Sequence, residues 1–294
     1  MQQSALISPY ELHELLQSDA ASQIKIVDAT YGIPGFPASA IMNFNTGRIG
    51  NAAFFDIDTI AKAGARYAHT LPSALEFSKA VSALGIHNTD TVIVYDQRGI
   101  AFAAARAWWM FRVMGHTDVT VLNGGLKKWK AEGRAVTDEV TQLRTPRHFT
   151  ARFHGELVRD KADVTGLIGS KTTQIVDARA AARFAGTVPE PRAGLRSGHI
   201  PGSKSVPFQS LLNADGTLKG EGELVAIFKA AGVDPAKPVV ASCGSGVTAG
   251  VIALALAKLG QSNAAVYDGS WSEWGMETAG TPVASIFTTA TSVR

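Results

Sequence analysis

The sequence predicts an α/β protein built from two tandem domains, each a mostly parallel sheet flanked by helices. Three observations lead to this prediction. The 294 residues are 46% hydrophobic and 18% charged, which suits one large or two ordinary globular domains. Short apolar runs typical of buried strands alternate with helical patterns. The same landmarks also recur in the same order in both halves of the chain.

Four pairs of segments define this internal repeat. First half against second, they are Ile24–Ala29 and Gln174–Arg179, Gly47–Asn51 and Gly198–Gly202, Thr91–Asp96 and Pro238–Cys243, and Asn123–Trp129 and Asp268–Trp274. Their nearly constant offset indicates duplication, and strands that alternate with helices favour parallel sheets. We therefore expect an N-terminal domain at residues 1–140, a polar linker at 141–160 and a C-terminal domain at 161–294.

Composition excludes several classes of protein. Net charge is only +3 without a basic run, so nucleic acid binding is not expected. The chain has no run of 18 apolar residues and no secretory signal pattern, so neither a membrane span nor secretion is expected. The Ser8-Pro9-Tyr10-Glu11 stretch is instead a capping box that begins a helix. With a single cysteine no internal disulfide can form, and we expect a cytoplasmic location.

That single cysteine, Cys243, follows the apolar run Val239–Ser242 and precedes a predicted helix from about Val247 to Leu259. A strand, a tight loop and a helix direct backbone N–H groups and the positive end of the helix towards one point. Cysteines in such surroundings ionise more readily than the ordinary pKa of about 8.5 implies. A lone cysteine can also be a small buried hydrophobe, but the Gly-Ser-Gly turn after Cys243 favours a nucleophile.

Asp96 occupies in the first half the position of Cys243 in the second. Because a carboxylate cannot replace a thiolate nucleophile, we expect the N-terminal domain to be catalytically silent. Two-domain proteins often place their sites where domains meet, so the first half can lend residues to a site centred on Cys243.

Several cysteine chemistries do not fit the residues around Cys243. Cysteine phosphatases need an arginine that closes the phosphate loop, but Ala249 and Gly250 stand there. Histidines that could serve a cysteine hydrolase exist, yet no hydrolase signature surrounds the thiol. One cysteine and scattered histidines give no zinc-ligand spacing. We expect neither a metal nor a cofactor.

The loop Cys243-Gly244-Ser245-Gly246-Val247-Thr248, the tandem α/β repeat and the single cysteine resemble the two-domain rhodanese family. The loop is most similar to that of the 3-mercaptopyruvate sulfurtransferases, since thiosulfate-preferring members carry basic residues directly after the cysteine. The resemblance implies that Cys243 takes sulfur from 3-mercaptopyruvate, releases pyruvate and holds a persulfide. Cyanide, a small thiol or thioredoxin would then accept the sulfur.

The resemblance also implies the roles of other residues. Arg183 and Arg192 would bind the carboxylate and keto oxygens of the substrate, a task suited to forked guanidinium groups. Ser245 would form a proton-handling triad with His69 and Asp58. Arg179 instead suits a structural ion pair. The loop residues expected to contact substrate are Gly244, Gly246, Val247 and Thr248.

Two other functions stay open at this point. The first keeps the fold and changes the donor to thiosulfate, although this compact dianion would favour cations that the loop lacks. The second is a non-catalytic persulfide carrier or binding module. It would hold sulfur on Cys243 without turnover.

Overall fold

The computed structural model of the protein describes residues 4–32, 40–99, 102–139 and 144–286. It divides into two compact units. Unit 1 comprises Met1–Ala65, Leu71–His154 and Leu212–Lys219, and unit 2 comprises Arg66–Thr70, Gly155–Leu211 and Gly220–Arg294. Each unit thus contains a short segment from the other half of the sequence. Among the described helices, none is long and apolar enough to cross a membrane.

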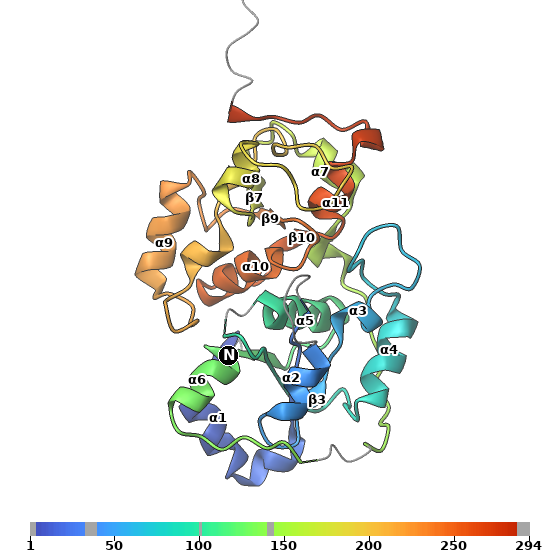
Figure 1. Ribbon diagram of the computed structural model, residues 1–294, viewed down its shortest axis with the longest axis vertical. Coiled ribbons are helices and arrows are strands. Elements are labelled where there is room, and N and C mark those ends of the chain that lie inside the picture. Colours follow the sequence, from blue (N-terminus) through green and yellow to red (C-terminus); the bar gives the residue numbers. More distant parts are fainter. Residues whose placement is uncertain (1–3, 33–39, 100–101, 140–143, 287–294) are drawn as a thin grey trace, which may run out of the picture. The chain divides into compact units, whose positions relative to one another are not determined.

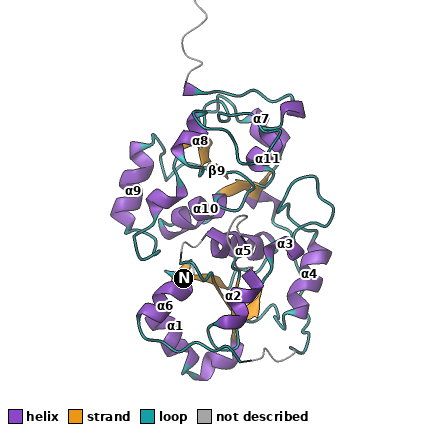
Figure 2. Cartoon of the chain, in the orientation of Figure 1, coloured by secondary structure: helices purple, strands orange, loops and turns teal. Residues whose placement is uncertain are grey.

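Unit 1 is built on a sheet flanked by helices (Figures 1 and 2). The sheet has five strands in the order β1-β5-β4-β2-β3, and every pairing is parallel. The strands are β1 (Leu6–Ile7), β2 (Ile24–Asp28), β3 (Ala53–Phe54), β4 (Thr91–Tyr95) and β5 (Val119–Leu122). The helices are α1 (Pro9–Leu16), η1 (Asp19–Gln23), α2 (Ala40–Thr46), α3 (Ile57–Ile60), α4 (Ala74–Ala83), α5 (Phe102–Val113) and α6 (Gly125–Ala131). The predicted capping box of α1 is present, with the Glu11 N–H donating to the Ser8 hydroxyl.

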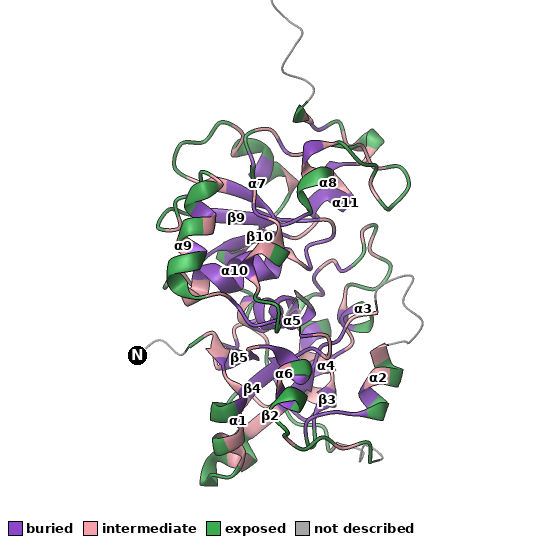
Figure 3. Ribbon diagram, turned by 60° about the vertical axis from the view of Figure 1, so that its left-hand side comes forward, coloured by how far each residue is buried: buried purple, intermediate pink, exposed green. Residues whose placement is uncertain are grey.

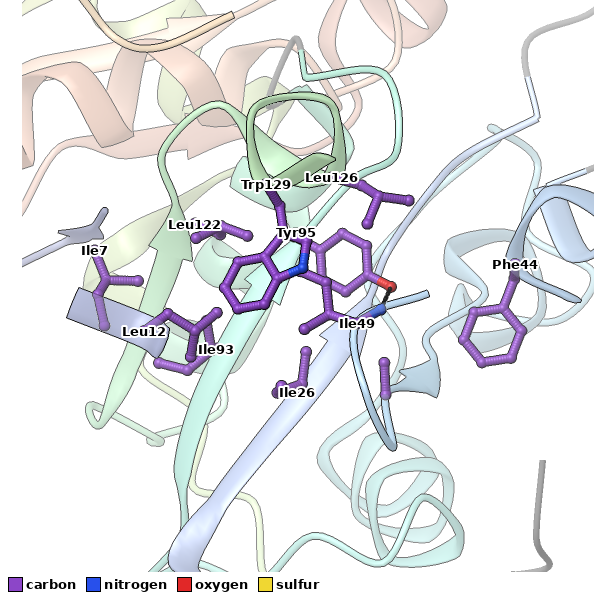
Figure 4. Packing of buried hydrophobic residues seen from close by; sticks show 11 residues of the cluster. Ile7, Leu12, Ile26, Phe44, Ile49, Ile93, Tyr95, Leu122, Leu126 and Trp129 are labelled. Carbon is purple, nitrogen blue, oxygen red and sulfur yellow. Dashed lines mark hydrogen bonds between the residues drawn. The ribbon is translucent and has the colours of Figure 1, made fainter. Parts of the chain in front are cut away.

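Helices α1 and α6 lie side by side and cover one face of this sheet (Figure 1). Leu12 of α1 and Trp129 of α6 pack there against Ile93 and Tyr95 of β4. Figure 4 shows this cluster, in which the buried Tyr95 hydroxyl accepts a hydrogen bond from the Ile49 N–H at 3.3 Å. Burying such apolar side chains, at roughly 25 cal/mol per Å² of apolar surface, is the main contribution to holding the helices on the sheet.

The described part of the predicted linker belongs to both units. Residues 144–154 group with unit 1, whereas Gly155–Leu157 and Val158–Arg159 form a short helix and a strand of unit 2. Phe149 is 2% exposed and packs edge-on against Phe77 and Phe111, with ring centroids 6.0 and 6.4 Å away. Arg147 forms an ion pair with the buried Asp90 at 2.8 Å. Residues 141–143 of the predicted linker lie outside the described residues. Polar composition therefore did not reveal that a single aromatic side chain anchors this segment in a core.

Unit 2 has a second five-stranded parallel sheet, in the order β6-β10-β9-β7-β8. Its strands are β6 (Val158–Arg159), β7 (Gln174–Asp177), β8 (Lys204–Ser205), β9 (Val239–Ser242) and β10 (Ala265–Tyr267). Its helices are η2 (Gly155–Leu157), α7 (Lys161–Gly166), α8 (Ala181–Ala185), η3 (Phe208–Leu211), α9 (Glu221–Ala230), α10 (Ala249–Lys258), α11 (Ser270–Trp274) and η4 (Glu277–Ala279).

The core of unit 2 surrounds its central strand, β9. Helix α10 packs on β9 and β10, and both α10 and β9 are coloured largely as buried in Figure 3. Val164 of α7 and the fully buried Trp271 and Trp274 of α11 form a cluster with Val240 of β9. A helix that is apolar on nearly every side needs such enclosure, which explains the continuous apolar sequence of α10.

The two sheets have the same strand order, as expected for two tandem α/β domains. Tyr95 of β4 pairs with Asp28, and Ser242 of β9 pairs with Asp177 in the same register. The residue that follows each pair is therefore equivalent: Asp96 in unit 1 and Cys243 in unit 2. The predicted α/β fold with parallel sheets is confirmed.

Candidate active site

Cys243 is the first residue after β9 and is 2% exposed. The loop turns at Gly246, whose φ of 78° lies in the left-handed region that favours glycine. Helix α10 begins at Ala249 and not at the predicted Val247, because Val247 and Thr248 form a preceding turn in which their carbonyls accept the N–H groups of Gly250 and Val251. The thiol therefore lies between a central strand and the start of a buried helix, as the sequence predicted.

The beginning of α11 fixes the backbone on both sides of the thiol. The Cys243 N–H donates to Oγ of Ser270 at 3.2 Å, and the Cys243 carbonyl accepts the Trp271 N–H at 3.0 Å. The Gly244 carbonyl accepts both the N–H of Ser272 at 2.8 Å and its hydroxyl at 2.7 Å. Because the N–H of Cys243 is committed to Ser270, any cradle for an anionic sulfur must come from N–H groups that follow it.

Ser270 adopts a strained backbone conformation to do this. Its φ is 47°, in the left-handed region that non-glycine residues rarely enter, and its side chain is fully buried. Its hydroxyl donates to the Tyr267 carbonyl at 2.8 Å, which leaves the oxygen lone pairs to accept the Cys243 N–H. The sequence repeat located this segment, but the role of Ser270 was not predicted.

Arg183 and Arg192, the two predicted substrate-binding residues, come together beside Gly244. A Cβ atom built on Gly244 would lie 3.2 Å from Nη2 of Arg183 and 4.0 Å from Nη1 of Arg192. Arg183 belongs to α8 with its side chain 26% exposed, whereas Arg192 is in an exposed loop. Glycine at this position leaves room for guanidinium groups within one residue of the thiol.

Glu190 holds Arg183 in a forked ion pair. Arg183 donates from Nε to Oε1 at 3.1 Å and from Nη2 to Oε2 at 2.5 Å, and the Glu190 side chain is only 1% exposed. This bidentate geometry fixes the plane of the guanidinium and leaves Nη1 for a ligand. No role was predicted for Glu190 from the sequence. In the sequence, only its position two residues before Arg192 indicated that Glu190 could lie near the site.

Arg179 is the buried centre of the ion network, as its predicted structural role requires. It pairs with Asp177 at 2.7 Å, with Glu190 at 2.8 Å, and lies 4.2 Å from the ring centroid of Trp271. Burial alone would lower the pKa of Arg179, but the charges and hydrogen bonds of Asp177 and Glu190 outweigh this and raise it. The network therefore keeps Arg179 charged and Glu190 fixed.

His69 and Ser245 also come together. Arg66–Thr70 belongs to unit 2, and there Nδ1 of His69 lies 3.0 Å from Oγ of Ser245. Both side chains are buried, and His69 has a φ of 63°. Asp58 belongs to unit 1, where it is the second residue of α3 and is exposed. Its part in a triad stays a prediction.

The remaining loop residues line the same turn. Val247 is 4% exposed, while Thr248 is half-buried and precedes α10 without a capping hydrogen bond from its side chain. Within the part of the chain that the structure describes, no cluster of three or more histidine, cysteine or carboxylate side chains could hold a metal ion. The site thus offers a thiol, two guanidinium groups and a histidine–serine pair.

A tandem pair of parallel α/β domains, with one cysteine in the loop after a central strand, defines a class of proteins. The model of the Rhodanese-like domain matches this chain twice, at residues 8–132 and 160–277. The chain therefore belongs to the family of proteins built from rhodanese-like domains.

Individual relatives are similar over nearly the whole chain. The 3-mercaptopyruvate sulfurtransferase of Rattus norvegicus is 39% identical over 275 residues, which cover 92% of both chains. The thiosulfate sulfurtransferase of the same organism is 42% identical over 273 residues, covering 92% of this chain and 91% of the relative. The crystal structure of SseA from Escherichia coli, described as a 3-mercaptopyruvate sulfotransferase, matches with a TM-score of 0.81 and 38% identity, over 92% of this chain and all of that one.

Proposed function

We propose that this protein is a sulfurtransferase that moves the sulfur of 3-mercaptopyruvate to a thiophilic acceptor through a persulfide on Cys243. The observation that carries the proposal is the convergence of Arg183 and Arg192 beside Gly244, within one residue of the thiol. An α-keto acid has a planar carboxylate and a keto oxygen, and guanidinium groups bind such oxygens well. The similarity to relatives named 3-mercaptopyruvate sulfurtransferase supports the same donor.

The reaction would proceed in two transfers. The Cys243 thiolate attacks the sulfur of 3-mercaptopyruvate, so an S–S bond forms while the C–S bond breaks. The electron pair of the C–S bond stays on carbon as the enolate of pyruvate, which takes up a proton. An acceptor thiolate or cyanide then attacks the outer sulfur of the persulfide. The S–S bond breaks, and its electron pair returns to Cys243 as thiolate.

The His69–Ser245 pair would handle the proton that the enolate requires. A hydroxyl and an imidazole at hydrogen-bond distance can pass a proton between them, and positioned groups of this kind accelerate reactions typically 10²–10⁴-fold. Asp58 would orient His69 as the third member of the triad. Glycine residues 244 and 246, with Val247 and Thr248, would let the loop backbone approach the anionic sulfur.

Thiosulfate is the second candidate donor, because relatives named thiosulfate sulfurtransferase are 42% identical. Steady-state kinetics distinguish the two donors. We expect kcat/KM for pyruvate release from 3-mercaptopyruvate to exceed kcat/KM for thiocyanate formation from thiosulfate and cyanide. A higher value with thiosulfate would overturn the assignment of the donor.

Mass spectrometry tests the covalent step directly. After exposure to 3-mercaptopyruvate, the intact protein should gain the mass of one sulfur atom, located on Cys243. A Cys243→Ser variant should show neither the gain nor turnover. A stable persulfide without turnover in the unaltered protein would indicate a sulfur carrier, the third possibility that the sequence left open.

Other features of the proposal concern the cellular setting. Thioredoxin and small thiols are proposed acceptors, because a chain with one cysteine has no second thiol of its own to resolve a persulfide. The same single cysteine supports a cytoplasmic location.

Residues 1–140 would form a catalytically silent domain with Asp96 in the cysteine position, joined by a linker at 141–160 to the catalytic domain at 161–294.

A further inference from the structure

Among the residues that the structure describes, the side chain of Arg192 makes a single hydrogen bond. Its Nη1 donates to Oγ of Ser272 at 3.3 Å, and no ion pair to Arg192 exists among the described residues. The Ser272 hydroxyl donates its own proton to the Gly244 carbonyl at 2.7 Å. Since that proton is committed, the lone pairs of Oγ are free to accept from Arg192. A hydrogen-bond chain therefore runs from Arg192 through Ser272 to the residue after the thiol.

The charges around Gly244 make this contact important. Arg179 and Arg183 form ion pairs with Asp177 and Glu190, so two positive charges face two negative ones. Arg192 forms no ion pair with a described residue, so these carboxylates do not balance its positive charge. Arg192 is thus the group whose full charge is available to a substrate carboxylate, yet it is held by one neutral hydroxyl.

We propose that Ser272 is a positioning residue that holds the guanidinium of Arg192 at the substrate site. This inference rests on the proposed function. An exposed arginine otherwise samples many rotamers, and immobilising such a side chain on binding costs conformational entropy. Ser272 meets part of that cost before substrate arrives. It acts through Arg192 and does not itself contact the sulfur.

The test is a Ser272→Ala variant compared with a matched control. Ser203 is also 8% exposed, also lies in unit 2, and its hydroxyl also donates to a backbone carbonyl, that of Ile200 at 2.6 Å. We expect Ser272→Ala to raise KM for 3-mercaptopyruvate roughly five- to tenfold with kcat little changed, because the loss concerns substrate binding. Ser203→Ala should leave KM unchanged. Equal KM values in the two variants would overturn the inference.

A double-mutant cycle separates an effect through Arg192 from an effect through the Gly244 carbonyl. In an Arg192→Ala background, Ser272→Ala should change KM no further, because the group that it positions is gone. A further rise of similar size would show that Ser272 acts through the loop, and the inference would be wrong. Failure of the proposed function itself would look different, since the unaltered protein would then gain no sulfur from 3-mercaptopyruvate.

Discussion

Nδ1 of His69 lies 3.0 Å from Oγ of Ser245, although 176 positions separate the two residues in the sequence. The contact is made inside unit 2, because the segment Arg66–Thr70 groups with that unit. The backbone of His69 is left-handed at this contact, with a φ of 63°, and the residue is 5% exposed. Strained conformations of this kind persist where the surroundings impose them, and they cluster at functional sites.

Removing the Ser245 hydroxyl should slow pyruvate formation. If the His69–Ser245 pair delivers the proton to the enolate, Ser245→Ala should lower kcat by about 10²-fold or more, with a smaller effect on KM. Stopped-flow measurement of pyruvate release reports this step. Ser203→Ala, which removes an equally buried hydroxyl, serves as the control. A kcat for Ser245→Ala equal to that of the control would exclude the pair from proton transfer.

A cation at position 244 should change the preference between donors. In Gly244→Lys the new Cβ would meet Nη2 of Arg183 at 3.2 Å, and the added charge would repel both nearby guanidinium groups. We expect the ratio of kcat/KM for 3-mercaptopyruvate to kcat/KM for thiosulfate to fall roughly tenfold or more.

The matched control for this change is Gly222→Lys, on the exposed side of α9, where a Cβ would meet nothing within 4 Å. It adds the same charge to the same unit. A similar fall in the ratio for both variants would mean that net charge, and not the crowding of Arg183, sets the preference.

Loss of the Glu190 charge should destabilise the protein. Glu190→Gln removes the ion-pair partner of Arg183 and leaves Arg179 paired with Asp177, and breaking a buried pair in this way costs about 3–5 kcal/mol. Urea unfolding measures this loss of free energy. Glu132→Gln removes the charge of Glu132, which is 33% exposed and forms an ion pair with Arg134. This change should cost at most about 1 kcal/mol. Equal costs for the two changes would contradict the structural role of Glu190.

Asp96 should make unit 1 less stable as pH rises. Burial, followed by the nearby charge of Asp28, raises the pKa of Asp96 from 3.8 to about 6. Between these values the folded protein holds a proton that the unfolded chain has already released. The free energy of unfolding therefore falls as pH rises through this window, by up to about 3 kcal/mol, and this contribution changes little above it.

Asp96→Asn tests this dependence. Asparagine can still accept the Gly99 N–H that now donates to Oδ1 of Asp96, but it does not titrate. Urea unfolding at about pH 4 and about pH 7 should show a smaller decline for the variant than for the unaltered protein. If the free energy of unfolding fell by the same amount in both proteins, the titrating group would be a residue other than Asp96.

Much of the site could be predicted from the sequence, because its residues lie in segments with strong local patterns. Cys243 follows a continuous apolar run, and Gly246 stands where the loop needs a left-handed residue. Arg183 and Arg192 were identified through resemblance to a family, and the structure brings both beside Gly244. Glu190, in a loop, and Ser272, in the short helix α11, were not identified, since a single carboxylate or hydroxyl carries no periodic signal and acquires its role only through its neighbours.

The sequence by itself determined the α/β class, the recurrence of the same landmark segments in both halves and the position of the one thiol. Those features depend on apolar periodicity and turn residues, which are local properties of the chain. Only the tertiary structure decided that Phe149 anchors the polar segment before His154 in unit 1, and that Ser272 links Arg192 to the loop. It also gave the geometry of the pairing of His69 with Ser245, which the sequence implied only by resemblance. These contacts join segments distant in sequence, and their geometry follows from how sheets and helices pack, which no local pattern encodes.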